Sequence, residues 1–230
     1  MSSNYICLTL CKYPTLKSKV WAFGMMQKSH TYLKNTEGLQ FYKLMGSGKG
    51  DGFNPFPDWS IYALLTVWDK KEDIDSFLEL HELPKKYKNN ASEVVHIHMR
   101  CVKSHGYWSG VQPFIPHPDL NPESALIAVI TRATIRWHKL RKFWKYVPTA
   151  SNPITGAKGL LYTKGIGEVP IVQMATFSLW NSLKDMKRYA YESTDHRTAI
   201  ELTRKYNWYK EELFARFLID QINGNLDAFH

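Results

Sequence analysis

Along this chain, segments with the hydrophobic pattern of strands alternate with segments that have the pattern of helices, and the order of these segments occurs twice. The first half contains apolar, β-branched and aromatic runs of strand type at 5–13, 39–46, 59–68 and 92–102. Between them, residues 18–33 and the stretch from Ile74 to His81 place apolar side chains at helical spacing. The first half therefore predicts the order strand, helix, strand, strand, helix, strand.

The second half repeats this order. Strand-type runs lie at 125–134, 159–166, 169–180 and 211–219. A basic helix is expected from about Ile135, and a second helical stretch from about Ser182 to Tyr206. Aromatic residues mark equivalent positions of the two halves, which pairs Trp68 with Trp180, Tyr42 with Tyr162 and Trp108 with Trp208.

One βαββαβ unit is the ferredoxin-like arrangement, a four-stranded antiparallel sheet with both helices on one face. The other face is best buried against a second sheet. The sequence therefore predicts an α+β protein in which two ferredoxin-like βαββαβ repeats are fused into a single chain that resembles a dimeric α+β barrel. We expect repeat 1 over 1–114, a proline-rich linker over 115–124, and repeat 2, the half with the active site, over 125–230.

Composition supports a globular protein with a substantial core, because 44% of the 230 residues are hydrophobic and 14% are aromatic. The three cysteines, Cys7, Cys11 and Cys101, provide neither an even disulfide framework nor the paired spacing of a zinc site. The N-terminus lacks the pattern of an export signal, and no apolar run is long enough for a membrane span. We therefore expect a cytoplasmic protein.

The formal net charge of +9 is spread over both halves, with one concentrated stretch from Arg132 to Lys145. This stretch has no acidic residue and contains Trp137 and Trp144, so it could bind phosphates, lipid headgroups or the carboxylates of a buried cofactor. A solvated helix face is the alternative. The chain contains no nucleic-acid-binding fingerprint. The glycine-rich stretch 46–52 lacks the order of a P-loop and joins two strands, which argues against a nucleotide site.

His196 is the main candidate for a metal ligand, because it shares a helical face with Ala199, Ile200 and Thr203. An imidazole on such a face can bind the metal of a flat hydrophobic cofactor, although a buried or capping histidine has the same pattern. His81 shows this pattern in the first half and competes for the role. His96 and His98 point the same way from one strand, but no third ligand lies nearby in the sequence.

Arg216 lies in the strand-type segment LFARF, where an inward arginine could pair with a carboxylate or polarise bound oxygen. A solvent-facing arginine at a strand edge is the alternative.

Several sequence segments, taken together and in fixed order, resemble those of a known protein family. They are FYKLMGSGKGDGF, PDWSIYALLTVW, SHGYWSGVQPF, VITRATIR, KGIGEVPIVQMATFSLW, HRTAI and WYKEELFARF. Over about Leu39 to Phe217 the chain resembles the spheroidene monooxygenase family of carotenoid-modifying enzymes. The resemblance implies a haem b-dependent monooxygenase that uses dioxygen and an external electron donor, such as a ferredoxin with its reductase, to form a keto group on an acyclic carotenoid.

The resemblance also implies roles for individual residues. His196 falls in the HRTAI block and becomes the expected proximal haem ligand. Arg132, Arg136 and Arg216 become candidates for contacts with the haem propionates or for the distal pocket. Because carotenoids reside in bilayers, the basic stretch from Arg132 to Lys145 is expected to dock on anionic lipid.

Two other functions remain open on the sequence. Another haem reaction on the same fold, of the dehydratase or dismutase type, would turn over its substrate without a reductant. A non-enzymatic barrel that binds haem or a lipophile would use His196 only structurally.

Overall fold

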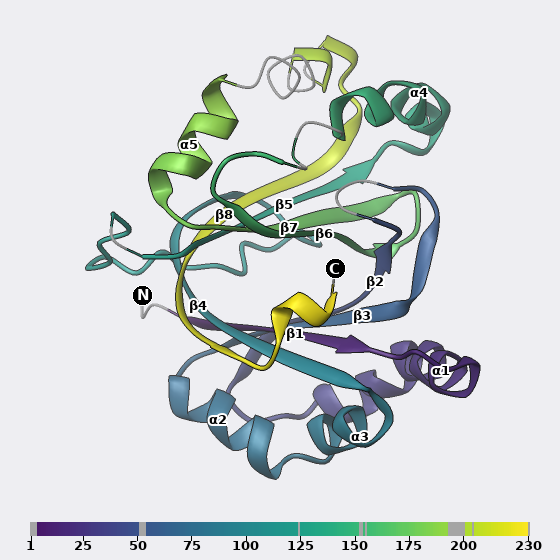
Figure 1. The fold of residues 1–230 in the computed structure, drawn as a ribbon, viewed down its shortest axis with the longest axis vertical. Helices are drawn as coiled ribbons and strands as arrows, with labels where there is room; N and C mark the ends of the chain where they lie inside the picture. Colours follow the sequence, from purple (N-terminus) through teal and green to yellow (C-terminus); the bar gives the residue numbers. More distant parts are fainter. Residues whose placement is uncertain are drawn as a thin grey trace.

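In the computed structural model, eight antiparallel strands of the described residues form one closed barrel in the order β1-β3-β2-β6-β7-β5-β8-β4 (Figure 1). The described residues are 4–50, 54–123, 125–151, 154, 156–192, 201–203 and 205–229. The strands are β1 Tyr5–Lys12, β2 Leu39–Gly48, β3 Pro57–Trp68, β4 Glu93–Gly106, β5 Ile127–Ile135, β6 Leu160–Val169, β7 Gln173–Trp180 and β8 Tyr209–Asn223. The strand order is that of two four-stranded ferredoxin-like sheets joined edge to edge, so the predicted α+β class and barrel are confirmed.

Helices cover the outer face of each half barrel (Figure 1). In the first half these are α1 Leu16–Leu33, α2 Lys71–Leu80 and α3 Glu82–Asn90. In the second half they are the short 3-10 helix η1 Trp137–Lys139, α4 Leu140–Ser151 and α5 Leu183–Glu192. A final 3-10 helix, η3, spans Leu226–Phe229. None of the helices in the described ranges has the length and hydrophobicity that a membrane crossing requires.

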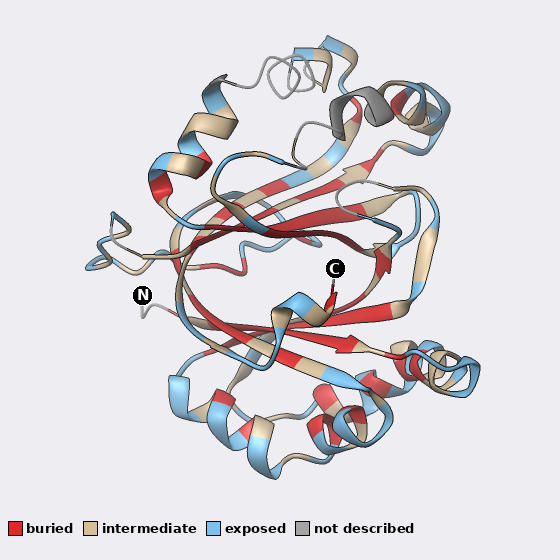
Figure 2. Cartoon of the chain, in the orientation of Figure 1, coloured by how far each residue is buried: buried red, intermediate tan, exposed pale blue. Residues whose placement is uncertain are grey.

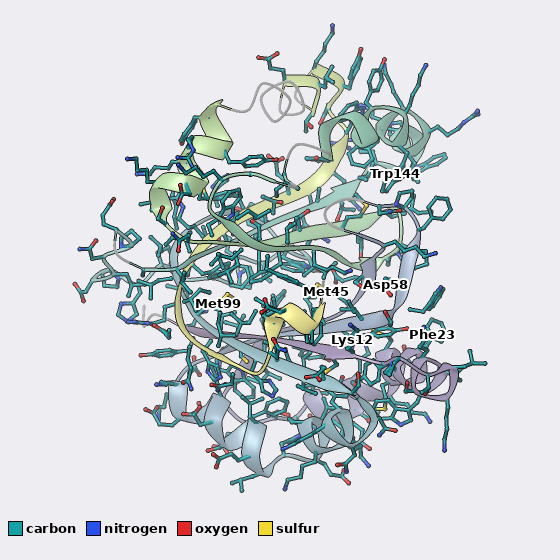
Figure 3. The ribbon with its side chains drawn as sticks, in the orientation of Figure 1. Lys12, Phe23, Met45, Asp58, Met99 and Trp144 are labelled. Carbon is teal, nitrogen blue, oxygen red and sulfur yellow. The ribbon has the colours of Figure 1, made fainter. Side chains whose placement is uncertain are left out.

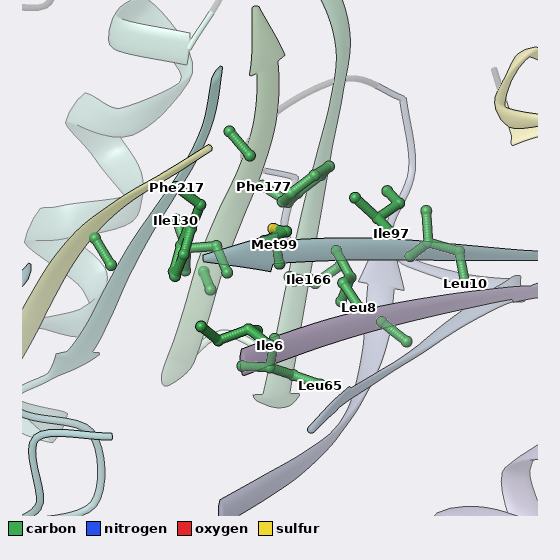
Figure 4. Packing of buried hydrophobic residues seen from close by; sticks show 14 of the residues in the cluster. Ile6, Leu8, Leu10, Leu65, Ile97, Met99, Ile130, Ile166, Phe177 and Phe217 are labelled. Atoms are coloured by element: carbon green, nitrogen blue, oxygen red, sulfur yellow. The ribbon is translucent and has the colours of Figure 1, made fainter. Parts of the chain in front are cut away.

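The barrel interior is filled by alternate residues of the strands, as the period of two along a strand requires. Figure 4 labels the centre of this core, which contains Ile6, Leu8, Leu10, Leu65, Ile97, Met99, Ile130, Ile166, Phe177 and Phe217. Buried positions run along the strands of both sheets, whereas the outward sides of the helices are exposed (Figure 2). The intervening strand residues face the helices, and their character distinguishes the two halves.

The strand registers define which residues of the two halves are equivalent. Trp68 pairs with Tyr5 and Leu39, and Trp180 pairs with Ile127 and Leu160, so the predicted match of these tryptophans agrees with the register. The match of Tyr42 with Tyr162 is wrong by one residue. Tyr42 lies opposite Thr66, and Thr163 lies opposite the equivalent Ser178, so Tyr42 corresponds to Thr163. A bulge occurs at the same place in both strands, after Leu39 and after Leu160, and does not change this correspondence.

The match of Trp108 with Trp208 is also wrong. Trp108 follows β4, whereas Trp208 precedes the equivalent strand β8. Similar aromatic surroundings in the sequence therefore do not reflect equivalent positions in the fold.

Two helix boundaries differ from expectation. The stretch from Ile74 does not continue through His81, because α2 ends at Leu80 and α3 begins at Glu82. Pro84 explains the break: its ring would meet the carbonyl of Leu80 in a continuous helix, but a proline is tolerated in the first turn of α3. In the second half β5 extends through Ile135, so the basic helix begins only after η1. The limits proposed for the repeats and linker stay predictions.

Candidate cofactor site

The helix–sheet interface of the first half is continuously packed. Its outward strand residues and its three helices form one cluster: Cys7, Cys11, Tyr13, Ala22, Met25, Leu33, Leu44, Tyr62, Leu64, Trp68, Ile74, Phe77, Leu83 and Tyr87. The cluster includes several large side chains that meet at the centre of the sheet. This interface is therefore closed by the protein's own residues.

Among the residues that the structure describes, the equivalent interface of the second half forms two smaller clusters. Around α5 the cluster contains Ile127, Val129, Trp180, Leu183 and Met186. Around α4 it contains Ile135, Phe143, Met174 and Trp208. The strand residues between the clusters are largely polar. We define them as the polar strip, which consists of Thr131, Thr163, Thr176, Ser178 and Arg216.

Two members of the polar strip, Thr163 and Thr176, replace larger residues of the first half. The other three correspond to residues that are already polar there, namely Thr9, Thr66 and His98. Leu64 pairs with Leu44 and Thr9, and its equivalent Thr176 pairs with Gly165 and Thr131. Leu64 therefore corresponds to Thr176, and Leu44 to Gly165.

At two further positions the side chain of the second half is also smaller than its equivalent in the first half. Tyr42 corresponds to Thr163 by the register given above, and Cys11 corresponds to Ala133 because they lie opposite Tyr62 and Met174, respectively. Four aligned positions are therefore smaller in the second half.

Several polar atoms in the strip have no hydrogen-bond partner in the part of the chain that the structure describes. They are the buried Oγ1 atoms of Thr163 and Thr176 and the Nε atom of Arg216. Ser178 differs, because its Oγ accepts a bond of 2.9 Å from Trp180 Nε1. Burial lowers the pKa of Arg216, partly opposed by Tyr191. A buried donor or acceptor without a partner costs about 1–3 kcal/mol, so this arrangement favours a ligand that supplies partners.

These residues fit a large flat group with apolar faces and a polar or acidic edge, as in haem. The two apolar clusters would contact the ring, the small residues between them provide room, and Arg216 offers an uncompensated positive charge. The fit rests on the described strand residues. His196, the expected iron ligand, lies outside the described residues.

The structure separates the predicted site arginines. Arg216 projects from the outer face of β8, because its neighbours Ala215 and Phe217 belong to the interior core. Arg132 is equivalent to Leu10 and faces the interior, where it is 3% exposed. The two arginines therefore do not line one pocket. Arg136 follows β5, and its Nε is buried without a partner among the described residues.

Arg132 belongs to a charged cluster that closes one end of the barrel. It forms an ion pair with Glu211 and lies 3.6 Å from Glu168. Glu168 also accepts bonds from Lys43 Nζ at 2.6 Å and from Trp108 Nε1 at 2.7 Å. Burial alone would raise the pKa of Glu211, but the backbone N–H groups of Ser109 and Gly110 and the charge of Arg132 lower it.

A cavity of about 880 Å³ opens beside this cluster. Its lining includes Tyr107, Arg132, Gln173, Tyr209 and Glu211. The Arg132 charge is already paired with carboxylates of the protein. The cluster therefore has a structural role, because it holds the loop that carries Trp108 against the end of the barrel.

Of the other candidate histidines, His81 and His96 have hydrogen-bond partners, whereas both ring nitrogens of His98 are buried without a partner among the described residues. His81 caps α3, because its Nδ1 accepts a bond of 3.1 Å from Leu83 N, and burial lowers its pKa. His96 Nδ1 lies 2.9 Å from Thr9 Oγ1. His98 is buried on the same face, and no group of three potential metal ligands occurs within the described ranges. By register His98 is the equivalent of Arg216.

The polar strip was not found from the sequence, although a signal for it exists. Aligning the two halves on Trp68 and Trp180 places Leu64 opposite Thr176 and Thr66 opposite Ser178. The loss of a large apolar residue at Thr176 can be read from this alignment. The correspondence of Tyr42 with Thr163 requires the pairing of β2 with β3 and of β6 with β7. Recognising Arg216 as outward-facing requires the register of β8.

Fold and site together define a duplicated α+β barrel in which one of two equivalent helix–sheet interfaces is built from smaller and more polar side chains. No protein-family profile matches the chain. It is 34% identical over 220 residues to the spheroidene monooxygenase of Rhodobacter capsulatus, covering 95% of this chain and 91% of that protein. It is 32% identical over 217 residues to the spheroidene monooxygenase of Cereibacter sphaeroides, covering 93% of this chain and 66% of that protein.

A solved aldoxime dehydratase shares the fold, with a TM-score of 0.61 and 10% identity over 95% of this chain and 82% of that chain. The chain belongs to the spheroidene monooxygenase family and is a monooxygenase.

Proposed function

We propose that the protein is a haem-dependent monooxygenase that converts a methylene group of an acyclic carotenoid into a keto group. The family supports a monooxygenase acting on a spheroidene-type substrate. The observation that carries the cofactor assignment is the loss of side-chain volume at four aligned positions of the second half, beside an unpaired arginine.

The proposed haem b would lie against the polar strip, between the clusters around α4 and α5. His196 would hold the iron, Arg136 would pair with a propionate, and Arg216 would provide a hydrogen-bond donor to the reacting oxygen. Bound haem would supply the iron for reductive activation of dioxygen. The apolar clusters would exclude water and orient the polyene. The donor of Arg216 would be its Nε–H, which has no partner among the described residues.

The overall reaction requires an electron donor. Inserting one oxygen atom into a C–H bond uses one dioxygen, two electrons and two protons, and it releases the second oxygen as water. Two successive insertions at one carbon give a geminal diol, which loses water to form the ketone. A ferredoxin with its reductase is the proposed class of donor.

The cofactor site is tested by refilling it with the residues of the first half. The variant Thr163→Tyr/Thr176→Leu restores the side chains found at Tyr42 and Leu64. We expect parent protein titrated with haem to develop a Soret band, and the refilled variant to bind haem at least about tenfold more weakly while remaining folded. Thr31→Leu makes a similar change at an exposed position of α1 and should bind haem as the parent does.

The iron ligand is tested in the same titration with His196→Ala, which should lose or shift the Soret band. A refilled variant that binds haem like the parent would place the cofactor elsewhere. Haem-loaded protein should then give the keto product from an acyclic carotenoid only with dioxygen and reductant. Turnover without reductant would favour a dehydratase- or dismutase-type reaction, and a parent that never binds haem would favour a lipophile-binding barrel.

A further inference from the structure

Apolar side chains are exposed along one side of α1. Leu16, Val20 and Phe23 share one face of the helix, opposite the buried Ala22 and Met25. The exposed fractions of the first three side chains are 80%, 64% and 59%. Isolated exposed apolar residues are ordinary, but an apolar stripe over the first two turns of a helix requires an explanation.

The stripe continues onto the neighbouring strands. The rings of Phe23 and Trp59 meet edge to face at a centroid distance of 5.5 Å, and Phe56 is exposed nearby in sequence. A groove of about 210 Å³ runs between these rings and the exposed turn containing Val169 and Ile171. It follows the short seam where β2 pairs with β6. We define this surface, from α1 to the β6–β7 turn, as the seam face.

Basic side chains lie on both sides of the seam face. Lys17 and Lys19 flank the stripe of α1, one on each side of Leu16 and Val20. At the opposite edge, Trp144 Nε1 donates a bond of 3.2 Å to the Ile171 carbonyl and thereby ties α4 to the turn. Figure 3 shows Phe23, Asp58 and Trp144 along the same side of the molecule. The exposed basic residues of α4 are Arg141, Lys142 and Lys145.

The nearby carboxylates do not cancel this charge. Asp58 lies 3.4 Å from Lys164 Nζ, and Glu168 lies 2.6 Å from Lys43 Nζ. Each acid is thus paired within the protein, so the seam face presents apolar side chains between uncompensated cations.

We propose that the seam face docks on an anionic lipid bilayer, with the apolar rim inserted among the headgroups and the lysines and arginines on the lipid phosphates. This combination of an apolar stripe with flanking basic residues is characteristic of interfacial membrane helices. Each basic residue near an anionic surface contributes about 1 kcal/mol. A second copy of the chain is a poorer occupant, because a symmetric contact would bring the same cations together.

This surface revises the expectation that the whole stretch from Arg132 to Lys145 contacts lipid. Arg132 is buried in the barrel, so only the α4 part of that stretch reaches the seam face. The groove lining extends from Phe23 and Trp59 to Gly165 beside the polar strip. On the proposed function, the groove would lead from the bilayer toward the cofactor interface.

The proposal is tested by sedimentation of the full-length protein with vesicles, without haem. We expect binding to mixed phosphatidylcholine–phosphatidylglycerol vesicles and little binding to phosphatidylcholine alone. Phe23→Ser/Trp59→Ser should weaken binding to the anionic vesicles at least about tenfold. Lys17→Glu/Lys19→Glu should weaken it by a similar factor and reduce its salt dependence. Leu80→Ser, which changes a comparably exposed residue of α2, is the matched control and should bind like the parent.

Parent protein that fails to sediment with anionic vesicles would overturn the proposal. Equal effects of Phe23→Ser/Trp59→Ser and Leu80→Ser would also overturn it. A parent dimer that becomes monomeric in Phe23→Ser/Trp59→Ser, with unchanged vesicle binding, would assign the face to self-association. Since the assay requires neither haem nor carotenoid, its outcome is independent of the proposed catalytic function.

Discussion

Replacing Arg132 with methionine should destabilise the fold and leave the cofactor interface intact. The side chain lies inside the barrel between Glu168 and Glu211, with its guanidinium carbon 5.7 Å from the centre of the Trp108 ring. Methionine fills similar apolar space but removes the charge. Two carboxylates then lose a shared cation near the barrel end.

The size of the effect follows from the remaining partners. Breaking a buried ion pair by removing one member costs about 3–5 kcal/mol. Glu168 and Glu211 are 16% and 20% exposed, Lys43 still pairs with Glu168, and the N–H groups of Ser109 and Gly110 still bind Glu211. We therefore expect a loss of about 2–3 kcal/mol, below the fully buried case. For a chain of this length that lowers Tm by about 5–10 °C.

Thermal and urea unfolding of Arg132→Met measures this loss. Arg100→Met is a matched control, because Arg100 forms a bidentate pair with Asp220 at the more exposed barrel surface. Arg100→Met should lower the free energy of unfolding by about 1 kcal/mol or less. A double-mutant cycle with Glu211→Gln should give a coupling of at least about 1 kcal/mol. Normal stability of Arg132→Met together with lost turnover would refute the structural role and place Arg132 in the chemistry.

Three further predictions concern other parts of the molecule. Arg216→Leu should retain haem but lower turnover about a hundredfold, since it removes a polarising donor; parallel loss of haem and turnover would contradict this role. Burial is the main cause that lowers the pKa of His96 to about 4, with contributions from the neighbouring His98 and Lys88. The unfolded state therefore binds more protons between about pH 6.5 and 4, and stability present above this range should decline as the pH falls through it. His96→Gln should flatten that decline in urea unfolding at several pH values, and an unchanged slope would assign it to other groups. Burial raises the thiol pKa of Cys7, Cys11 and Cys101 to about 12, so mass spectrometry should detect iodoacetamide adducts only after denaturation. Rapid labelling of Cys7 or Cys11 in native protein would show that the helices separate from the sheet, and rapid labelling of Cys101 would show that the barrel opens.

Much of the architecture could be predicted from the sequence because it depends on the spacing of apolar residues along each segment. Apolar, β-branched and aromatic runs identified the strands that the structure describes, and the order of strands and helices in each half indicated the ferredoxin-like units. Duplication then supplied the partner sheet. The alignment of β2 with β6 was wrong by one residue, because the tyrosines of FYKLMGSG and LYTKGIGE suggested that Tyr42 corresponds to Tyr162 instead of Thr163. A shift of one residue exchanges the inner and outer faces of a strand.

The same limitation explains the errors at the candidate site. Arg132 and Arg216 both lie in strand segments near aromatic residues, and their local patterns do not indicate that they lie on opposite faces of the sheet. Arg132 lies on the interior face because Ala128 and Ile130 of the same strand do so. The ion pairs with Glu168 and Glu211 come from two other strands, so they depend on long-range pairing that local patterns do not encode.

Duplication offers a physical reason for the unequal interfaces. Leu44 and Leu64 belong to the packed helix–sheet cluster of the first half. Gly165 and Thr176 at the equivalent positions have smaller side chains and do not provide the same apolar contact. Replacing a buried leucine with a small residue costs about 2–5 kcal/mol, a large fraction of the stability of a single domain. Because both halves share one closed barrel, the fully packed interface can offset the weaker one. The chain can therefore keep an interface in which the described strand residues are smaller, which a solitary unit of this size would tolerate poorly.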